Sequence, residues 1–119
     1  MLFREISGQE EIKKKLTGTI TDQRVSHAQL FYGPEGSGKL ALAIAYAQLL
    51  NCAHPRITSE GMDSCGECPS CQQYQKLAHP DLNFVFPSNT TKRITTKPSS
   101  RQFITEWRDF LLKNHYDVT

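Results

Sequence analysis

One segment, Gly33-Pro34-Glu35-Gly36-Ser37-Gly38-Lys39, limits the fold of this 119-residue chain more than any other feature. A short apolar run, Ala28 to Tyr32, leads into it, and a nearly all-apolar run, Leu40 to Leu50, follows it. The first run predicts a buried strand ended by a turn, and the second predicts a helix buried on most sides. Because a strand, a glycine-rich loop and a helix follow one another, we predict an α/β fold.

The spacing of this segment, G-x-x-x-x-G-K, is that of a phosphate-binding loop. Glycines let the backbone bend so that its N–H groups converge on phosphate oxygens, and the following helix adds its positive N-terminal end. An ordinary glycine-rich turn with a chance lysine is the alternative, and the flanking strand and helix argue against it. We therefore predict that the loop can hold the phosphates of ATP or ADP, with these residues around them: Gly33, Glu35, Gly36, Ser37, Gly38, Lys39 and Leu40.

Leu40 departs from the usual phosphate loop. That position normally carries Ser or Thr, whose hydroxyl binds Mg²⁺, and leucine cannot coordinate a metal. A second predicted strand, Leu82 to Phe86, ends in Pro87 and not in the acidic residue that a hydrolytic site needs. No Ser, Cys or His forms a recognisable catalytic set. We predict that the chain has no catalytic residues and does not hydrolyse ATP at a useful rate.

The four cysteines are spaced C-x12-C-x2-C-x2-C. Each C-x-x-C turn directs two thiolates to one point, and four thiolates make a closed structural zinc site. Two disulfides, a redox pair and an iron–sulfur cluster are the alternatives. No secretory signal is recognisable, which favours a reducing compartment and a metal over disulfides. His54 and His79 are predicted to be surface or packing residues, since the metal is already saturated by Cys52, Cys65, Cys68 and Cys71.

Two further helices are predicted from apolar periodicity. The first runs from about Gln9 to Thr21, begins with a capping box of Ser7 and Glu10, and carries a stripe of Ile12, Leu16 and Ile20. The last begins near Ser99 or Ser100, with a stripe formed by Phe103, Ile104, Trp107, Phe110 and Leu111. Between the helices, Cys52 to Cys71 is expected to be irregular and Ser88 to Ser100 to be a loop.

A formal charge of only +2 does not by itself indicate nucleic-acid binding, and no apolar run is long enough for a membrane span.

Taken together, these motifs resemble a family. The chain is similar to the AAA+ clamp-loader subunits of bacterial DNA polymerase III, the gamma/tau and delta-prime subunits. The resemblance covers about residues 3 to 86 and is specific because a phosphate loop is followed by a four-cysteine insert. The matching segments, besides Phe3, are Ile6-Ser7-Gly8-Gln9-Glu10, Arg24 to Lys39, Leu49-Leu50-Asn51-Cys52, Cys65-Gly66-Glu67-Cys68-Pro69-Ser70-Cys71 and His79-Pro80-Asp81-Leu82.

The resemblance implies that residues 1–119 are the N-terminal part of a P-loop AAA+ (RecA-like) three-layer domain, with an inserted zinc module at about residues 52–71. Leu40 favours the delta-prime type, and the gamma/tau motor ATPase is the alternative. The implied partners are other clamp-loader subunits, the sliding clamp and, through the complex, primer-template DNA, in the cytoplasm and without a membrane. A free-standing zinc nucleic-acid module fits poorly, because the charge is weak and aromatic residues do not interleave with Lys or Arg in the cysteine segment. Another P-loop enzyme, such as a small-molecule kinase, does not account for the cysteine insert.

The resemblance also implies an incomplete sheet. In the family the strand order is 5-1-4-3-2, so Ala28–Tyr32 and Leu82–Phe86 would be strands one and two, which are not neighbours. The strands between them would lie beyond Thr119. Each strand would then carry unpaired backbone groups on an open edge. We expect another chain to fill the gap, the two strands to pair directly, or order to depend on a longer parent protein.

Overall fold

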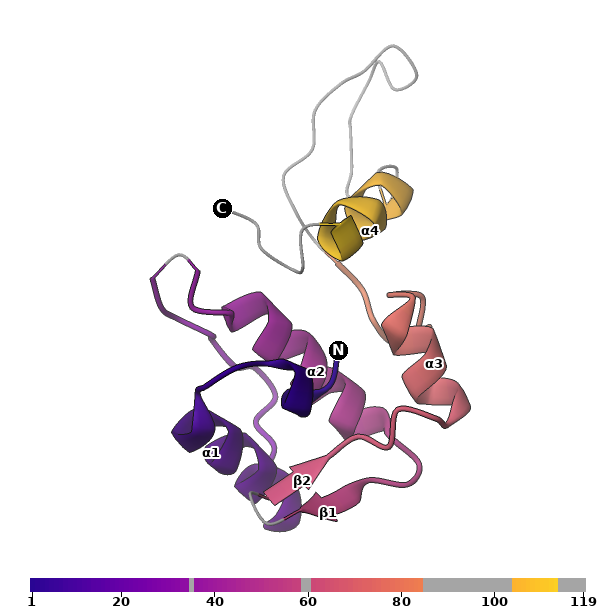
Figure 1. Cartoon of the computed structure of the whole chain (residues 1–119). Helices are drawn as coiled ribbons and strands as arrows, with labels where there is room; N and C mark the ends of the chain where they lie inside the picture. The colour runs from indigo at the N-terminus through magenta and orange to yellow at the C-terminus, as the bar shows by residue number, and fades with distance from the viewer. Residues whose placement is uncertain (35, 59–60, 85–103, 114–119) are drawn as a thin grey trace.

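Helix α2 occupies the centre of the computed structural model, which describes residues 1–34, 36–58, 61–84 and 104–113. The helices η1 and α1 flank α2 on one side and α3 lies on the other, with the β1–β2 hairpin near the end of α2 that leads into the cysteines (Figure 1). In chain order the elements are the 3-10 helix η1 (Phe3–Glu5), α1 (Glu10–Thr21), α2 (Lys39–Asn51), β1 (Arg56–Thr58), β2 (Gly61–Asp63), α3 (Pro69–Gln75) and α4 (Ile104–Lys113).

The core is built around α2 because this helix is apolar on nearly all of its faces. On one side it joins a buried cluster made with η1 and α1, whose members are Phe3, Leu16, Leu42, Ala45, Tyr46 and Leu49. On the other side it joins a second cluster made with α3 and α4, whose members are Ile44, Tyr74, Leu77 and Leu111. The prediction of a buried helix after the glycine-rich loop is confirmed.

Helix α1 begins at Glu10, one residue later than predicted, and the predicted capping box is wrong. The N-cap is Gln9, which lies in the left-handed region at φ 62° and makes no side-chain cap. Since the chain turns at Gly8 and Gln9, Ser7 is too far from the first helical turn to cap it. The Gln9 amide instead donates to the carbonyl oxygen of Ser37 at 3.2 Å, which ties the start of α1 to the glycine-rich loop.

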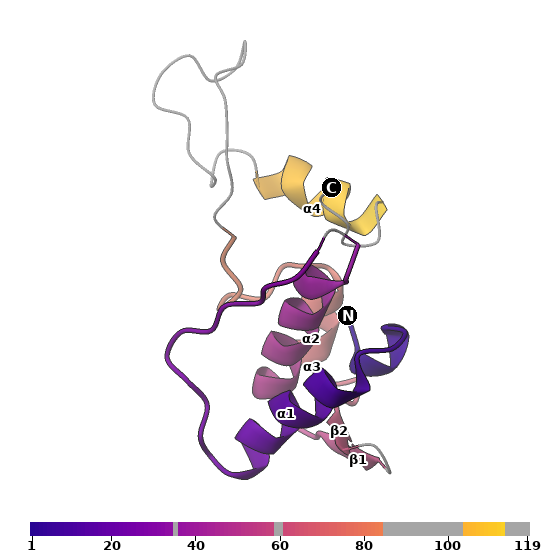
Figure 2. The ribbon, with the colours of Figure 1, turned by 90° about the vertical axis from the view of Figure 1, so that its left-hand side faces the viewer.

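The segment Ala28–Tyr32 is not a strand, which corrects the sequence-based prediction. No neighbouring strand is present among the described residues to pair with its backbone, and an isolated strand cannot satisfy its N–H and C=O groups. Leu30 and Tyr32 are 87% and 92% exposed, whereas Phe31 packs on Tyr46 of α2 with ring centroids 6.5 Å apart. Exposure to solvent therefore alternates over Leu30, Phe31 and Tyr32, although these residues form no strand. Figure 2 shows this connection bowing away from the helices.

The second predicted strand, Leu82–Phe86, is also not formed where it is described. Residues 82–84 have no regular secondary structure, and residues 85 and 86 lie outside the described residues. Leu82 and Phe84 pack against the second apolar cluster. The predicted loop, Ser88 to Ser100, lies outside the described residues as well.

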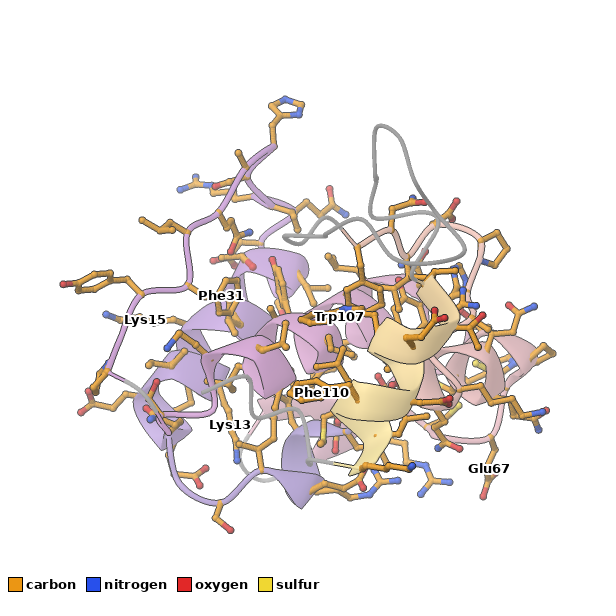
Figure 3. The ribbon with its side chains drawn as sticks, turned by 90° about the horizontal axis from the view of Figure 1, so that it is seen from above. Lys13, Lys15, Phe31, Glu67, Trp107 and Phe110 are labelled. Atoms are coloured by element: carbon orange, nitrogen blue, oxygen red, sulfur yellow. The ribbon has the colours of Figure 1, made fainter. Side chains whose placement is uncertain are left out.

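Helix α4 carries the predicted apolar stripe, although the residues around its expected start at Ser99 or Ser100, and Phe103, lie outside the described residues. Leu111 is fully buried. The rings of Trp107 and Phe110 stack with centroids 6.0 Å apart, and Figure 3 shows the two side chains next to each other along α4. Arg108 links the helix to the turn that follows α3, because its Nε donates to the carbonyl oxygen of Leu77 at 2.6 Å.

Within the described ranges, the one sheet is the antiparallel β1–β2 hairpin, in which Ile57 pairs with Met62 and Arg56 with Asp63. This hairpin lies between the first and second cysteines, so the expectation that Cys52 to Cys71 is irregular is wrong. The three-layer arrangement implied by the resemblance is not present in the described residues, which form helices packed around α2 with a small hairpin near its C-terminal end. None of the described helices is long and apolar enough to cross a lipid bilayer.

Candidate metal centre and phosphate loop

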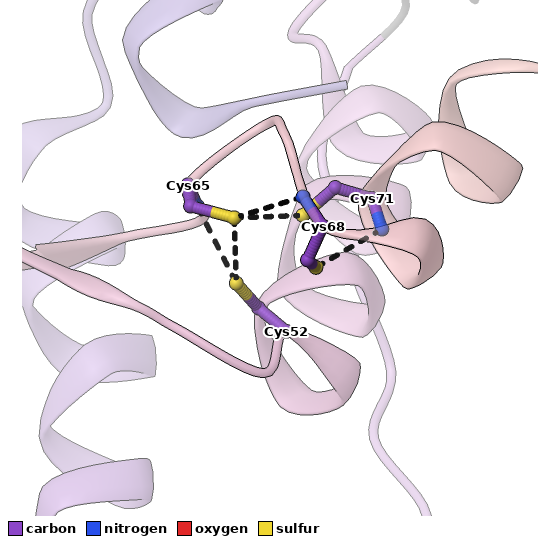
Figure 4. Close-up of side chains that lie close together, drawn as sticks. All are labelled: Cys52, Cys65, Cys68 and Cys71. Atoms are coloured by element: carbon purple, nitrogen blue, oxygen red, sulfur yellow. Dashed lines mark hydrogen bonds between the residues drawn. The ribbon is translucent and has the colours of Figure 1, made fainter.

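Three turns of the chain bring the four cysteines together (Figure 4). Cys52 is the C-cap of α2, where the backbone leaves the helix in an extended conformation. Cys65 follows β2, and Cys68 is the N-cap of α3. Cys71 lies in the first turn of α3, which Pro69 helps to start. The hairpin therefore returns the chain from the end of α2 to the start of α3.

The sulfur atoms fit a tetrahedral metal site. All four lie within 4.8 Å of one another, and the Cys65 sulfur is 3.6 Å from that of Cys52 and 3.9 Å from that of Cys71. Zn–S bonds of about 2.3 Å at tetrahedral angles place sulfurs about 3.8 Å apart. A disulfide needs a separation of about 2.05 Å, and all four cysteines are free. The disulfide alternatives are therefore not supported, and the residues can bind a metal ion.

Backbone N–H groups point at the sulfurs. The N–H of Cys68 donates to the sulfur of Cys65 at 3.3 Å, and that of Cys71 donates to the sulfur of Cys68 at 3.5 Å. The first of these turns requires Gly66 at φ 78°, in the left-handed region that glycine adopts without strain. Such donors favour the thiolate, which is the form that binds a metal.

Burial and hydrogen bonding act on these thiols in opposite directions. For Cys68, burial pushes the pKa upward, but hydrogen bonds from the backbone N–H groups of Ala53 and Cys71 help to outweigh it and lower the pKa to about 6. For Cys71, burial raises the pKa to about 12. Without a cation the buried cluster cannot hold four thiolates, whereas a bound divalent metal stabilises all of them.

Asp63, which the sequence analysis did not single out, fastens the N-terminal segment to the cysteine-bearing segment. Its carboxylate is buried and accepts the backbone N–H groups of Phe3 at 3.0 Å and Arg4 at 3.2 Å. The Arg4 guanidinium reaches the same carboxylate at 3.2 Å and the carbonyl oxygen of Ser64 at 3.1 Å. The only signal in the sequence is an acidic residue two positions before a cysteine, which is too common to be informative.

The two histidines near the cysteines are not among the grouped metal ligands of the described residues. His54 is exposed. His79 stacks on Tyr74 with ring centroids 4.6 Å apart, and its Nδ1 accepts the backbone N–H of Asp81 at 3.1 Å. The prediction that both are surface or packing residues is confirmed.

The glycine-rich loop lies at the opposite end of α2 from the cysteines. Gly36 and Gly38 have φ angles of 77° and 78°, so the loop uses glycine where the backbone needs it. Gly38 is the N-cap of α2, and Lys39 is its first residue. The ammonium of Lys39 bends back to donate to the carbonyl oxygens of Gly33 and Pro34, both at 3.3 Å. Glu35 lies outside the described residues.

A cleft of about 430 Å³ opens beside this loop, between α1, residues 29–34 and the start of α2. Gly33, Ser37 and Lys39 contribute to its wall. The side chain of Leu40, in contrast, packs against the apolar cluster of Ile44, Tyr74, Leu77 and Leu111. Leu40, which follows the loop lysine, therefore packs in the core and offers no hydroxyl group that could bind a metal.

Comparison with known proteins assigns this chain to a class. Residues 8–113 match the protein family described as "DNA polymerase III, delta subunit". The match covers most of the chain, and the chain belongs to this family.

Its relatives include two kinds of DNA polymerase III subunit. It is 37% identical over 59% of its length to subunit tau of Bacillus subtilis, and 34% identical over 76% to subunit tau/gamma of Haemophilus influenzae. It is also 35% identical over 66% of its length to subunit delta' of Bacillus subtilis. The aligned residues make up 12%, 12% and 22% of these relatives, so the chain spans a small part of each. No solved structure matches the chain.

Proposed function

We propose that this chain is the N-terminal part of a clamp-loader subunit of the replicative DNA polymerase III, and that the subunit is of the delta-prime type. The family match supports a polymerase III subunit, and the relatives include both the tau/gamma and the delta' types. Loading of a sliding clamp onto primer-template DNA, together with other clamp-loader subunits in the cytoplasm, would be the task of the longer protein. Residues 1–119 would supply the first part of its AAA+ domain.

The observation that carries the delta-prime proposal is the position of Leu40. Its side chain packs into the apolar cluster between α2, α3 and α4, at the position where a motor ATPase needs a hydroxyl for Mg²⁺. The glycines and Lys39 can still present N–H groups and a positive charge to phosphates. We propose that this loop, Gly33 to Leu40, holds ATP or ADP without supporting turnover.

We also propose that the metal at the four cysteines is structural zinc. Four thiolates leave no open coordination position for a substrate or a water, so the metal would contribute stability and no chemistry. The near-tetrahedral sulfur separations support zinc, and the N–H donors at Cys65 and Cys68 favour the thiolate form of these two ligands. The centre would hold the end of α2, β2 and the start of α3 in place.

Nucleotide binding and turnover, measured on the chain and on its full-length parent, test the delta-prime proposal. We expect fluorescent ADP to bind, Lys39→Ala to weaken binding at least about tenfold since the loop lysine contacts phosphates, and no ATP turnover above background. Gln72→Ala, on the exposed side of α3, is the control and should leave binding unchanged. Steady turnover that Lys39→Ala abolishes would instead establish the gamma/tau motor alternative. Binding that is unaffected by Lys39→Ala would remove the phosphate loop from the proposal.

A second measurement tests the clamp-loader assignment itself. The full-length parent, mixed with the other clamp-loader subunits of the same organism, should co-sediment with them and complete clamp loading. Failure to associate, with zinc content and secondary structure intact, would contradict the assignment.

A further inference from the structure

Gln48 is a polar residue buried completely within the apolar helix α2. It lies one helical turn before Cys52. A neutral amide at such a position needs partners for both its oxygen and its nitrogen, because an unpaired buried polar group destabilises the fold.

The oxygen of the Gln48 amide has its partner. The main-chain nitrogen of Met1 donates to Oε1 of Gln48 at 2.9 Å. This bond fixes which way the amide faces, since its oxygen must lie toward Met1. The NH₂ group is thereby directed away from Met1.

The nitrogen of the Gln48 amide is buried and is the only donor that this side chain can offer to a cysteine. Among the described residues, no acceptor meets full hydrogen-bond geometry with Nε2 of Gln48, which is itself buried. Its side chain nevertheless interacts with Cys71, where burial raises the pKa of the thiol and the bond from Gln48 opposes that rise. Cys71 is fully buried too, so no water competes for this contact.

We infer that Gln48 is a positioning residue for the metal centre, which donates a hydrogen bond from Nε2 to the metal-bound thiolate of Cys71 and is held in that orientation by Met1. The inference rests on the metal site proposed above. Metal ligands are commonly oriented by such outer hydrogen bonds, and losing one typically lowers metal affinity about 10- to 100-fold. A thiolate is a better acceptor than a thiol, so metal binding would supply the partner that the amide nitrogen lacks.

Two variants of Gln48 distinguish donation of a hydrogen bond to Cys71 from a role that only holds Met1 in place. Gln48→Met fills a similar volume but can neither donate nor accept. Gln48→Glu keeps an acceptor for Met1 but loses the donor. Tyr46→Phe is the matched control, because it removes a buried hydroxyl from the same helix, one bonded to Thr19 at 2.7 Å and to Gln29 at 3.3 Å.

The experiment measures zinc affinity of the folded chain, with its own N-terminus, by competition with a chromophoric chelator. We expect both Gln48 variants to bind zinc about 10- to 100-fold more weakly and Tyr46→Phe to bind it as the parent chain does. With Co²⁺ in place of zinc, the sulfur-to-cobalt charge-transfer band of Gln48→Met should move to longer wavelength, because a thiolate without the hydrogen bond holds its electrons less tightly. A purely structural role would not move this band.

Other outcomes would overturn the inference. If Gln48→Glu binds zinc normally while Gln48→Met does not, the residue only tethers Met1. Parent-like affinity and an unshifted cobalt band in Gln48→Met would show that Gln48 makes no contribution to the centre. If Gln48→Met does not fold, Gln48→Glu carries the same two measurements. A parent chain that binds no metal would refute the proposed metal site itself, which is a separate result.

Discussion

The segment that holds the cysteines and the segment that leads into the glycine-rich loop were both predicted from short motifs, yet only the cysteine segment forms its contacts from residues close together in the chain. Around the cysteines, the backbone N–H groups of Cys68 and Cys71 each donate to the sulfur of the cysteine three positions earlier. Three of the four thiols are buried. Before the glycine-rich loop, Leu30 and Tyr32 extend into solvent, and no sheet among the described residues covers them. A motif closed by residues a few positions apart can form locally, whereas a strand needs partners from elsewhere.

The largest expected effect is on the cysteine segment. Cys71→Ser should abolish zinc binding and remove cooperative thermal unfolding, because structural zinc contributes about 10–16 kcal/mol of binding free energy in small zinc domains. Elemental analysis and thermal melting would measure both. Ser70→Ala, in the same turn of α3, is the control and should keep one zinc per chain. A Cys71→Ser protein with full zinc content would break the contrast between the two segments.

Two leucines test the contrast in burial directly. Leu42 is 3% exposed and Leu30 is 87% exposed. Leu42→Ala should lower the free energy of unfolding by about 2–5 kcal/mol, since it leaves a cavity beside α1 and η1. Leu30→Ala should change it by less than about 0.5 kcal/mol. Urea unfolding at fixed zinc concentration measures both, and equal losses would mean that Leu30 is covered in solution.

Two acidic residues near the cysteines should differ as well. Asp63→Asn replaces a buried carboxylate that accepts the backbone N–H groups of Phe3, Arg4 and Ser64 and the guanidinium of Arg4. It should lower the free energy of unfolding by about 1.5–3 kcal/mol. Glu67→Gln breaks an exposed pair with Arg56 at 3.4 Å, and Figure 3 shows Glu67 at the edge of the molecule. Its effect should be about 0–1 kcal/mol. The same urea unfolding experiment compares them, and a larger loss for Glu67→Gln would reverse the assignment.

The smallest effect on stability should come from replacing Leu30 and Tyr32, the two exposed apolar side chains before the glycine-rich loop. The double variant Leu30→Ser and Tyr32→Ser should leave the melting temperature nearly unchanged, because neither side chain is buried. It should reduce self-association, since exposed apolar side chains favour contacts between molecules. Sedimentation velocity at increasing concentration measures this, with Ile57→Ser, an exposed site on the hairpin, as the control. Unchanged association would show that these residues do not attract another copy.

The sequence predicted the features whose cause is local. Apolar periodicity located the start of α1 to within a residue, and the nearly all-apolar run from Leu40 to Leu50 identified α2 as a buried helix. The cysteine spacing identified four residues whose sulfurs do come together. The family resemblance was equally informative, because the match over residues 8–113 confirms membership. The loop glycines, Gly36 and Gly38, were expected from the motif and do adopt left-handed angles.

The features that were predicted wrongly or missed depend on residues far away in the chain or on weak sequence patterns. Ala28–Tyr32 has the composition of a strand, but composition cannot supply a neighbouring strand. The three-residue strands of the hairpin are too short and too polar for alternation to reveal them. Asp63 was missed because its role depends on Phe3 and Arg4, about sixty positions away in the chain.

Helix α2 has a mechanical consequence that follows from its two ends. It starts at the glycine-rich loop and ends at the first cysteine, and its 13 residues span about 20 Å at 1.5 Å per residue. Because apolar clusters pack against the helix along its length, the helix acts as a rigid spacer between its two ends. The distance between the cysteine cluster and the glycine-rich loop is therefore set by the length of this one helix.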